Sequence, residues 1–456
     1  MDMVSYRGPI APGGVSSALA QLFFANYFES GKWWYIQDNS LQTLLNGEQK
    51  PAHVKDLNLN ILNGHYRYCN EYLWPLVHDL HEFIEFNQAD YHYYAEFNQL
   101  LANEFLKLSQ KLSTTKWFIH DYQLAYLPKL LGKNHKIIYF WHIPWPYNIT
   151  PENCANIQTI VQSLLYSYVI GFHTQEYAHN FLDFVYNHLP ECQVDFEHFT
   201  VTIKNLSHTT KIVVAPLGID FKAWEKLSSI PETEIANLSV NKFIPKIPYI
   251  LSVDRADYTK GLYQRIQAIQ YFFENYPEFI EKLTFIQLSG KTRPGLKAFD
   301  NYFAKCKNLC SLVNSCWGKN NWQPITWIEQ SFTANELAIW YRKANIMLVN
   351  PVRDGLNLTA KEYIACQTIP LKTGNPGMLN LSSGAGTFTE IGKYTMFTNF
   401  MDPQQIAQSI YECLKMTKKE RAIRMDFLSE QIASSNLIDW WLLLKNNFEK
   451  LEIAKK

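Results

Sequence analysis

The chain has 456 residues, which is too long for one compact domain, so two domains are expected. Lys and Arg together number 42, as do Asp and Glu, so the net charge gives no sign of a basic nucleic-acid-binding surface. A hydrophobic content of 47% supports substantial cores and argues against a disordered chain. The N-terminus lacks a signal-peptide pattern and no apolar run reaches membrane-spanning length, which predicts a cytoplasmic protein.

The eight cysteines are scattered, and only Cys306, Cys310 and Cys316 lie close together. No CxxC pair or nearby histidine accompanies them, so buried free thiols are a better interpretation than a zinc site. No other His-rich or acidic cluster has metal-ligand spacing. We therefore predict no metal and no cofactor.

The first half of the chain alternates strands and helices. A short strand ends near Tyr6, the glycine turn Gly13-Gly14 opens a helix, and residues 33–36 resemble a strand. Helical periodicity covers 66–80 and 91–112, and apolar strands follow that end at Asp121 and His142. A helix over 156–168, a strand over 169–174 and a helix over 175–189 continue the alternation. The polar stretch 228–248 then marks a domain boundary, placed at residue 235.

The second half repeats the alternation. Strands are predicted over 248–254, 283–290, 325–330 and 345–351, with helices between them and a helix over 358–367. The predicted domains are 1–235 and 236–433. Such alternation predicts parallel sheets covered on both faces, and polar side chains that follow the strands fall where open α/β sheets bind ligands. Two domains of this kind that face a central cleft would bring these side chains together.

The stretch 349–367 carries the strongest functional signal. A short apolar run breaks into a polar turn containing Asp354 and Gly355, and a helical pattern with Glu362 follows. A strand, a glycine turn and a helix N-terminus form a natural site for an anion, because unpaired backbone N–H groups and the helix dipole converge there. The two carboxylates could hold two ends of an extended ligand. The hypothesis is a nucleotide-sugar donor site.

Each cationic candidate has a structural alternative. Arg255 and Lys260 could neutralise a departing diphosphate, or they could belong to a solvated loop with Asp254 and Asp257 as local partners. Arg293, after the next strand, is either a phosphate ligand or an ordinary exposed arginine.

The remaining candidates are equally open. Glu362 completes a capping-box pattern with Thr359, or it could bridge two ribose hydroxyls. Asp354 could be only a turn former. His142 either binds a substrate hydroxyl or is structural, and Asp121 beside His120 resembles an acid/base arrangement.

Taken together, these residues resemble the trehalose-6-phosphate synthase family, retaining glycosyltransferases of the two-Rossmann-domain GT-B type. The matching motifs run in family order over nearly the whole chain: PGGVSSAL, YLWPLVH, HDYQL, WHIPWP, IGFHT, LGID, SVDRADYTKGL, PVRDGLNLTAKEY and NPGMLNLSSGAG. The resemblance implies an α/β protein with two Rossmann-like parallel-sheet domains facing a central cleft. It also implies that the C-terminal residues 434–456 form a helix that packs back on the first domain.

The resemblance also implies roles for individual residues. Arg255 and Lys260 would hold the donor diphosphate, Glu362 the ribose, and Asp354 and His142 the transferred sugar. The other positions that it implies are donor contacts at Gly14 and at the backbone of Gly355, Asn357 and Leu358, and acceptor contacts at Arg7, Tyr66, Trp74, Asp121 and Arg293. Catalysis is assigned to Arg255, Lys260, Asp121 and His142, with front-face attack assisted by the departing phosphate.

The leading interpretation is glucosyl transfer from UDP- or GDP-glucose to glucose 6-phosphate, giving trehalose 6-phosphate. The sequence departs from the family near the acceptor, where GKWWYIQD lacks the second tryptophan and His65-Tyr66 replaces a tyrosine pair. Glycerol 3-phosphate or a cyclitol phosphate therefore remains open as acceptor, as does a non-catalytic sugar-phosphate sensor. No nucleic-acid or membrane partner is expected, and a homo-oligomer is an open alternative.

Overall fold

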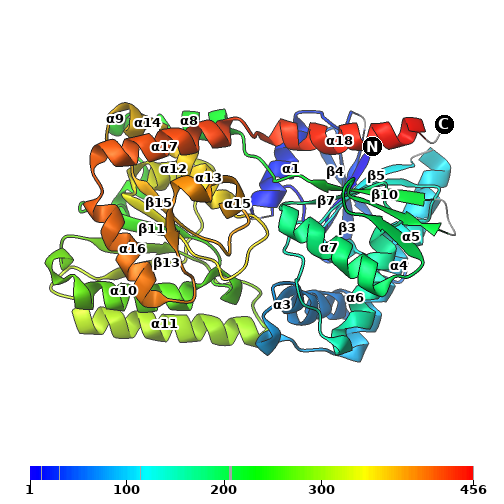
Figure 1. Cartoon of the computed structure of the whole chain (residues 1–456), viewed down its shortest axis with the longest axis horizontal. Coiled ribbons are helices and arrows are strands. Elements are labelled where there is room, and N and C mark those ends of the chain that lie inside the picture. The colour runs from blue at the N-terminus through cyan, green and yellow to red at the C-terminus, as the bar shows by residue number, and fades with distance from the viewer. Residues whose placement is uncertain (12, 30, 113–114, 205–207, 455–456) are drawn as a thin grey trace. The chain divides into compact units, whose positions relative to one another are not determined.

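The computed structural model describes residues 1–11, 13–29, 31–112, 115–204 and 208–454. The chain divides into two compact units, one of Met1–Leu217 with Leu437–Lys456 and one of Gly218–Asn436 (Figure 1). Each unit contains one sheet with helices on its faces.

The sheet of the first unit has ten strands in the order β4-β3-β2-β1-β5-β6-β7-β10-β9-β8. Six neighbouring strands, from β2 to β10, are parallel, and they form the Rossmann-like part of the sheet. The strands are β1 (Asp2–Val4), β2 (Trp33–Gln37), β3 (Ser40–Leu45), β4 (Glu48–Ala52), β5 (Lys116–His120), β6 (Lys136–Phe140), β7 (Val169–Phe172), β8 (Cys192–Asp195), β9 (Thr200–Ile203) and β10 (His208–Val214).

Both edges of this sheet depart from the parallel arrangement that the sequence predicted. β3 and β4 continue β2 as an antiparallel meander, and β8 and β9 do the same beside β10. The predicted parallel arrangement does not extend to these edge strands, and for β3 and β4 the reason is local. Asp38-Asn39 and Asn46-Gly47, which join β2 to β3 and β3 to β4, all have positive φ angles, as two-residue hairpin turns of type I′ require.

The helices of the first unit cover this sheet (Figure 1). One predicted helix, over 66–80, is interrupted by a π-helical turn at Tyr68–Leu73, a widening that often marks functional sites. The helices are α1 (Gly14–Phe24), α2 (Leu59–Arg67), α3 (Trp74–Val77), α4 (Gln88–Leu112), α5 (Leu127–Leu131), α6 (Pro151–Leu164), α7 (Gln175–His188) and α18 (Leu437–Ala454).

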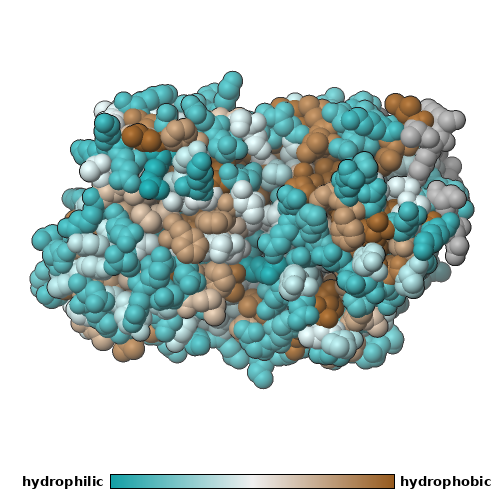
Figure 2. Space-filling model, in the orientation of Figure 1, coloured by the Kyte–Doolittle hydropathy of each residue, from teal (hydrophilic) through white to brown (hydrophobic). Residues whose placement is uncertain are grey.

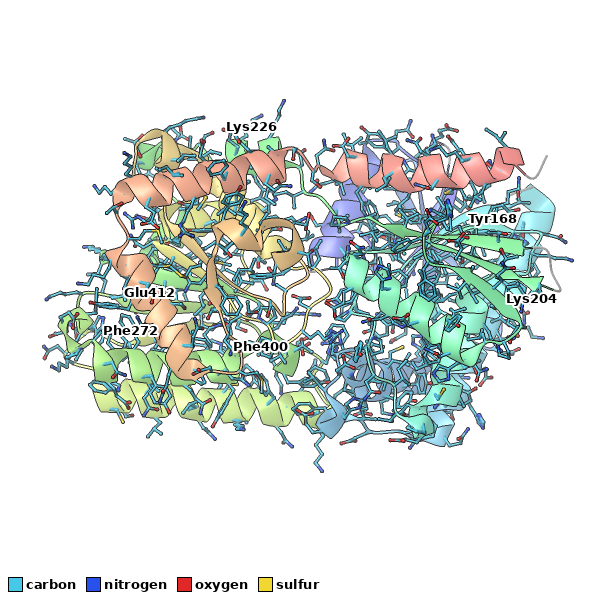
Figure 3. The ribbon with its side chains drawn as sticks, in the orientation of Figure 1. Tyr168, Lys204, Lys226, Phe272, Phe400 and Glu412 are labelled. Carbon is cyan, nitrogen blue, oxygen red and sulfur yellow. The ribbon has the colours of Figure 1, made fainter. Side chains whose placement is uncertain are left out.

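The C-terminal helix α18 belongs to the first unit although it follows the second unit in the chain. The ring of Trp441 lies 4.7 Å from that of Phe28 and 5.1 Å from that of Phe118, measured between centroids. Further along α18, Phe448 packs against Tyr168, which directly precedes β7. Tyr168 is labelled in Figure 3. Lys116 and Lys136 both form ion pairs with Glu452. Aromatic burial and ion pairs therefore fix the helix along its length.

The sheet of the second unit is parallel throughout, in the order β13-β12-β11-β14-β15-β16. Counted within the unit this is 3-2-1-4-5-6, the order of dinucleotide-binding Rossmann folds, in which ligands bind where the strand order reverses. That point lies between β11 and β14. The strands are β11 (Tyr249–Val253), β12 (Thr284–Leu288), β13 (Ile325–Ile328), β14 (Ile346–Val349), β15 (Met378–Ser382) and β16 (Met396–Thr398).

Two hydrophobic clusters, one containing Trp340 and Tyr363 and the other containing Phe272 and Ile406, account for much of this unit's core. Phe272 is labelled in Figure 3. Parallel strands buried on both faces produce such paired clusters. The helices are α8 (Phe221–Ser228), α9 (Glu232–Ile235), α10 (Leu262–Asn275), α11 (Lys297–Trp317), α12 (Ala334–Lys343), α13 (Leu358–Cys366), α14 (Thr368–Lys372), α15 (Phe388–Ile391), α16 (Pro403–Lys415) and α17 (Lys418–Ala433).

The expected domain boundary at residue 235 falls inside the second unit, which begins at Gly218. Arg342 of α12 donates to the carbonyl of Ser228 at 3.0 Å and forms an ion pair with Glu232 at 2.9 Å. Ile235 and Val240 are buried in the core of this unit. The polar stretch 228–248, which suggested a linker, is therefore packed against α12. Its polar composition comes only from the side chains on its outer side.

The face of the molecule in Figure 2 is mostly hydrophilic, with apolar side chains gathered along its upper edge in the region of α18. The exposed apolar residues of that helix are Ile438, Leu442, Leu443 and Ile453. Within the residues that the structure describes, no helix is both long and apolar enough to cross a membrane.

Candidate active site

Two loops meet at the carboxyl ends of β11 and β14, where the strand order of the second unit reverses. The first loop, 254–261, carries Arg255 and Lys260, and the second, 350–357, carries Asp354 and Gly355. Nζ of Lys260 lies 2.6 Å from Oδ2 of Asp354, and both side chains are nearly buried, at 11% and 15% exposure. The same carboxylate oxygen accepts a hydrogen bond from the side chain of Asn357 at 3.2 Å. The predicted donor residues Lys260, Asp354 and Asn357 are therefore in direct contact.

The second loop is held in place by the glycine-rich segment that follows β15. The N–H of Asp354 donates to the carbonyl of Gly384 at 2.7 Å, and the N–H of Gly386 donates to the carbonyl of Asp354 at 3.1 Å. A Cβ at Gly386 would lie 2.1 Å from the carbonyl oxygen of Gly355, which is far closer than packing permits. The motif NPGMLNLSSGAG thus packs directly on the motif PVRDGLNLTAKEY.

Helix α13 begins at Leu358, with Asn357 as its N-cap. The Asn357 side chain accepts a hydrogen bond from the N–H of Ala360 at 3.2 Å, and its φ of 84° is one that asparagine tolerates better than most residues. The N–H groups of the first helical turn have no partner within the helix, so this end of α13 is suited to an anion. The capping-box interpretation of Thr359 and Glu362 is wrong, because Asn357 supplies the cap.

Glu362 lies in the second turn of α13 and is partly buried. Its Oε2 accepts a hydrogen bond from the hydroxyl of Tyr341 on α12 at 3.1 Å. Burial raises the pKa of Glu362 to about 7, although the hydrogen bond from Tyr341 lowers it. A carboxyl group with a shifted pKa beside a helix N-terminus is a functional candidate.

A buried arginine that the sequence did not single out supports both loops. Arg265 of α10 is 2% exposed. Its guanidinium donates to Asn350 after β14 at 2.7 Å, to Gln287 of β12 at 2.8 Å and to Asp254 after β11 at 2.8 Å. It also donates to the carbonyl of Lys260 at 3.1 Å. One planar group thereby fixes the ends of three neighbouring strands, which only arginine can do.

Arg293 is buried, so its interpretation as an ordinary exposed arginine is wrong. Its side chain is 3% exposed and Nη1 lies 2.6 Å from Oδ2 of Asp257, a carboxylate with no exposed surface. Burial raises the pKa of Asp257, but Arg293, Arg255 and Lys260 lower it more, to about 2. The alternative of a solvated loop is therefore wrong as well. Asp254 pairs with Arg265 and Asp257 with Arg293, and three cations converge around the loop 254–261.

Asp121 and His142 lie at the carboxyl ends of β5 and β6 in the first unit. The backbone N–H of His142 donates to Oδ1 of Asp121 at 3.2 Å, so these two predicted residues are also in contact. Nδ1 of His120 and Nε2 of His142 are 3.0 Å apart. The structure therefore pairs His120 with His142. The sequence had suggested His120 as an acid/base partner of Asp121.

Both histidines are held in their neutral form. Burial lowers the pKa of His142 well below the ordinary value, and His173 lowers it further. Burial and the neighbouring His142 lower the pKa of His120 in the same way. A neutral imidazole offers one donor and one acceptor, so His142 is suited to binding a hydroxyl group and not to binding a phosphate.

Arg7 and Tyr66, two predicted acceptor residues, both line a small cavity together with Tyr6, His65 and Asn70. Its volume of about 10 Å³ is close to the minimum for one water molecule. Gly14 begins α1 and is exposed. Trp74 is only 5% exposed, and its indole packs 4.2 Å from the ring of His78. The residues predicted for the acceptor thus include both partly exposed and fully packed side chains.

The family model described as Glycosyltransferase family 20 matches residues 36–450. The chain belongs to glycosyltransferase family 20. It is therefore a glycosyltransferase, and its two α/β units have the GT-B fold of this family. Of the predicted site residues, Arg7 and Gly14 precede the matched range.

Known relatives of this family 20 enzyme are similar over most of their length. The alpha,alpha-trehalose-phosphate synthase (UDP-forming) of Encephalitozoon cuniculi is 29% identical over 84% of this chain and 79% of that protein. A trehalose-6-phosphate synthase of Escherichia coli is also 29% identical, over 95% of this chain and 89% of the relative. A solved E. coli structure, described as bound with UDP-2-fluoro glucose, has a TM-score of 0.84 and 27% identity over 98% of each chain.

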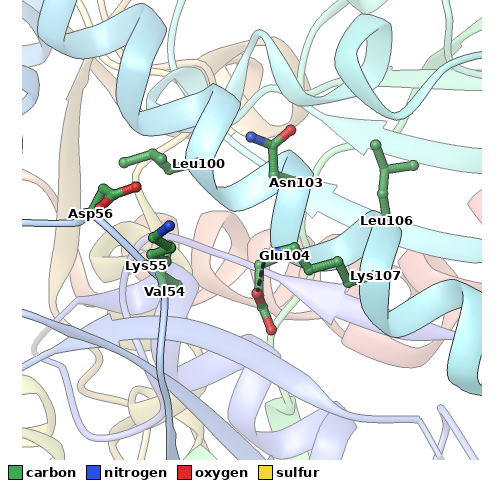
Figure 4. A pocket seen from close by; sticks show the side chains of 8 residues that line it. All are labelled: Val54, Lys55, Asp56, Leu100, Asn103, Glu104, Leu106 and Lys107. Carbon is green, nitrogen blue, oxygen red and sulfur yellow. Dashed lines mark ion pairs between the residues drawn. The ribbon is translucent and has the colours of Figure 1, made fainter.

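A larger cavity of the family 20 enzyme, of about 350 Å³, lies between residues 54–56 and α4 of the first unit (Figure 4). It contains none of the residues predicted from the sequence. Its charged side chains are of both signs, and Lys107 pairs with Glu104 at 3.6 Å. We therefore do not assign a ligand to it. Among the described residues, no group of three or more His, Cys, Asp or Glu side chains is placed to hold a metal ion.

Proposed function

We propose that this enzyme transfers glucose from UDP-glucose to glucose 6-phosphate with retention of configuration, giving trehalose 6-phosphate and UDP. The observation that carries the proposal is the contact of Lys260 with Asp354, which in turn contacts Asn357, the N-cap of α13, at the reversal of strand order in the second unit. Arg255 lies in the same loop as Lys260. Cations and unpaired N–H groups at that position suit a nucleoside diphosphate. Two relatives support the choice of substrates by their names, one a UDP-forming alpha,alpha-trehalose-phosphate synthase and the other a trehalose-6-phosphate synthase.

Arg255 and Lys260 bind the diphosphate in this proposal, and the backbone of Gly355, Asn357 and Leu358 donates hydrogen bonds to it. Glu362 accepts hydrogen bonds from two ribose hydroxyls. Asp354 binds hydroxyls of the glucosyl group, aided by His142 and by the close approach of Gly14. Lys260 and Asp354 form an ion pair, so the residues proposed to bind phosphate and sugar are in direct contact.

The acceptor roles follow the same reasoning. Asp121 binds acceptor hydroxyls, Arg7 and Arg293 bind its phosphate, and Tyr66 and Trp74 complete the contacts. Arg293 already uses one nitrogen for Asp257, so its phosphate contact requires the other nitrogens of the guanidinium.

The chemical step needs no protein base in this proposal. The acceptor hydroxyl attacks the anomeric carbon on the face that the diphosphate leaves, and its proton passes to a departing phosphate oxygen. Arg255 and Lys260 stabilise the negative charge that grows on the diphosphate, and the remaining residues hold the reactants in position. No metal ion takes part, so we expect turnover to persist after dialysis against EDTA.

The proposal is tested by incubating the enzyme with UDP-glucose or GDP-glucose and each of several phosphorylated acceptors, and identifying products by mass spectrometry. A disaccharide phosphate formed from UDP-glucose and glucose 6-phosphate well above all other pairs is the expected result. Preference for glycerol 3-phosphate or a cyclitol phosphate would replace the acceptor and retain the donor site. Absence of any transfer or donor hydrolysis would overturn the proposal in favour of a sensor.

Variants of Arg255 and Lys260, the two cations of the loop 254–261, test the proposed diphosphate site. Arg255→Ala and Lys260→Ala should each reduce kcat by about 100- to 1000-fold, as expected when a preorganised group that stabilises developing charge is removed. Lys297→Ala, at an exposed position in the same unit, should leave kcat unchanged. Near-normal turnover in both loop variants would contradict the assignment of the diphosphate site.

A further inference from the structure

Asp121 has a backbone conformation that side chains rarely adopt. Its φ of 71° and ψ of 166° lie in a region populated almost only by glycine. Residues in such conformations persist only where the surrounding structure imposes them, and they gather at functional sites.

Three consecutive backbone carbonyls, of Asp121, Tyr122 and Gln123, each accept a hydrogen bond from a buried side chain. The hydroxyl of Tyr139 donates to the carbonyl of Asp121 at 2.5 Å, and that of Tyr94 donates to the carbonyl of Tyr122 at 2.7 Å. Such a run of side-chain donors fixes the direction of three successive peptide planes.

The third carbonyl, of Gln123, has two side-chain partners. Nε2 of His65 lies 3.0 Å from it, and the side-chain amide of Asn98 donates to it at 3.2 Å. His65, Tyr94, Asn98 and Tyr139 each have 0% exposure. Because these donors are fully buried, breaking any of the bonds would leave a polar group unsatisfied away from water.

The chemistry of His65 is defined by this contact. A carbonyl oxygen can only accept, so Nε2 of His65 carries the proton. Burial lowers the pKa of His65 to about 4, so the ring stays neutral at physiological pH. The ring is also held by its neighbours, since it stacks on Tyr94 at 5.4 Å and contacts Phe97 at 3.9 Å between centroids. His65 is therefore a fixed, neutral donor aimed at the turn after Asp121.

We infer that His65, Tyr94, Asn98 and Tyr139 form a clamp that holds Asp121 in its glycine-like conformation and so positions its carboxylate for the acceptor. The inference rests on the proposed function, in which Asp121 binds acceptor hydroxyls. His65 is a positioning residue in this account, since it acts through the backbone of the turn.

The clamp is tested first by stability, which does not depend on the acceptor. Asp121→Gly should unfold at a higher temperature than Asp121→Ala, because only glycine is unstrained in this conformation. In a His65→Leu background the turn can relax, so the difference in unfolding temperature between Asp121→Gly and Asp121→Ala should become smaller. An equal difference in unfolding temperature in the wild-type and His65→Leu backgrounds, or no difference in either, would contradict the clamp.

The positioning role is tested by kinetics on the full-length enzyme. His65→Leu should raise the KM for the acceptor at least tenfold and leave the KM for UDP-glucose within twofold. His65→Gln should restore most of the acceptor KM, because the glutamine amide can donate from nearly the same place as Nε2. His208→Leu is the matched control, since His208 is a buried histidine whose Nε2 lies 3.0 Å from the carbonyl of Ser167, away from this turn.

Two outcomes separate the inference from the proposed function. If the wild-type enzyme uses no phosphorylated acceptor, the proposed function fails. The unfolding temperatures of the Asp121 variants still show whether the clamp holds this residue. Equal changes in the donor and acceptor KM of His65→Leu, or no rescue by His65→Gln, would contradict the positioning role. If His65→Leu does not fold, Tyr139→Phe replaces it in both tests, because it removes one hydroxyl and keeps the ring.

Discussion

Glu362 shows how a residue proposed to bind the donor can lower stability. In the folded protein its carboxyl group is buried beside Tyr341, and burial raises its pKa from 4.5 to about 7. In the unfolded chain the group has its ordinary pKa. Its stabilising contribution is therefore complete below pH 4.5 and is lost as the pH rises through 7, when the buried group must ionise. The cost at high pH is about 3 kcal/mol.

Glu362→Gln should therefore stabilise the ligand-free protein above pH 7 and leave it unchanged near pH 4.5, since the amide is neutral at every pH. The same change should weaken UDP-glucose binding about 10- to 100-fold, because hydrogen bonds from the ribose to a charged acceptor are lost. Thermal unfolding from pH 4.5 to 8.5 and calorimetric titration with UDP-glucose measure the two effects. Glu412→Gln, on the exposed side of α16, is the control for both.

A gain in stability without loss of affinity would remove Glu362 from the donor site. Loss of stability at pH 8 would show instead that the carboxylate is satisfied in the folded protein.

The sequence located the residues of the candidate donor site but not their partners. Lys260, Asp354 and Asn357 follow strands at positions where a Rossmann fold binds ligands, and the structure brings them into contact. Arg265 was missed because it lies on a helix that looks ordinary in sequence. Its role comes from three strand ends that are far apart in the chain. Periodicity cannot reveal such long-range contacts.

At the scale of elements, the loop after β14 depends on the segment after β15. Gly384 and Gly386 permit their backbone to approach within hydrogen-bonding distance of the loop that carries Asp354. A side chain at either position would meet backbone atoms, which cannot move aside independently. The shape of the candidate donor site is thus determined partly by residues that need not touch a ligand.

Gly386→Ala should reduce UDP-glucose affinity at least about tenfold, because the added Cβ would displace the backbone at Gly355 by more than the contact can absorb. Gly290→Ala is the control, because a Cβ there would lie at an ordinary 3.4 Å from its neighbour. Calorimetric titration with UDP-glucose compares the two variants. Equal affinities would show that the loop accommodates the change and that its packing does not set the site.

Strand and helix positions were largely predictable, whereas the sheet edges were not. Buried parallel strands such as β6 and β14 are short apolar runs, which the sequence shows directly. β4 reads Glu-Gln-Lys-Pro-Ala and is mostly exposed, so no pattern of burial indicates a strand. The turn Asn46-Gly47 was the available signal, since this dipeptide favours a hairpin. The π-helical turn at Tyr68–Leu73 has no sequence signature of this kind.

At the scale of the whole molecule, the chain leaves the first unit at Leu217 and returns to it at Leu437. The returning helix α18 supplies Trp440 and Trp441 to the core of the first unit, with 3% and 2% exposure. Stability of the first unit therefore depends on residues that follow the second unit in sequence. The resemblance of the C-terminal stretch to the family's closing helix allowed a helix to be predicted, but not the rings that it contacts.

Trp441→Ala should destabilise the first unit by about 3–5 kcal/mol, because it removes a large buried side chain that packs on Phe28 and Phe118. Leu442→Ala changes the next residue, which is 40% exposed, and should cost less than about 0.5–1 kcal/mol. Urea denaturation followed by tryptophan fluorescence and circular dichroism measures both. Similar losses in the two variants would show that α18 contributes little to that core.

The central claim is that the enzyme joins glucose from UDP-glucose to glucose 6-phosphate with retention. The most direct test is nuclear magnetic resonance of the product made from UDP-glucose labelled with ¹³C at the anomeric carbon. The account predicts a labelled non-reducing disaccharide phosphate with both anomeric centres in the α configuration, and UDP in equal amount. A β-configured labelled carbon, or free labelled glucose as the only product, would contradict it.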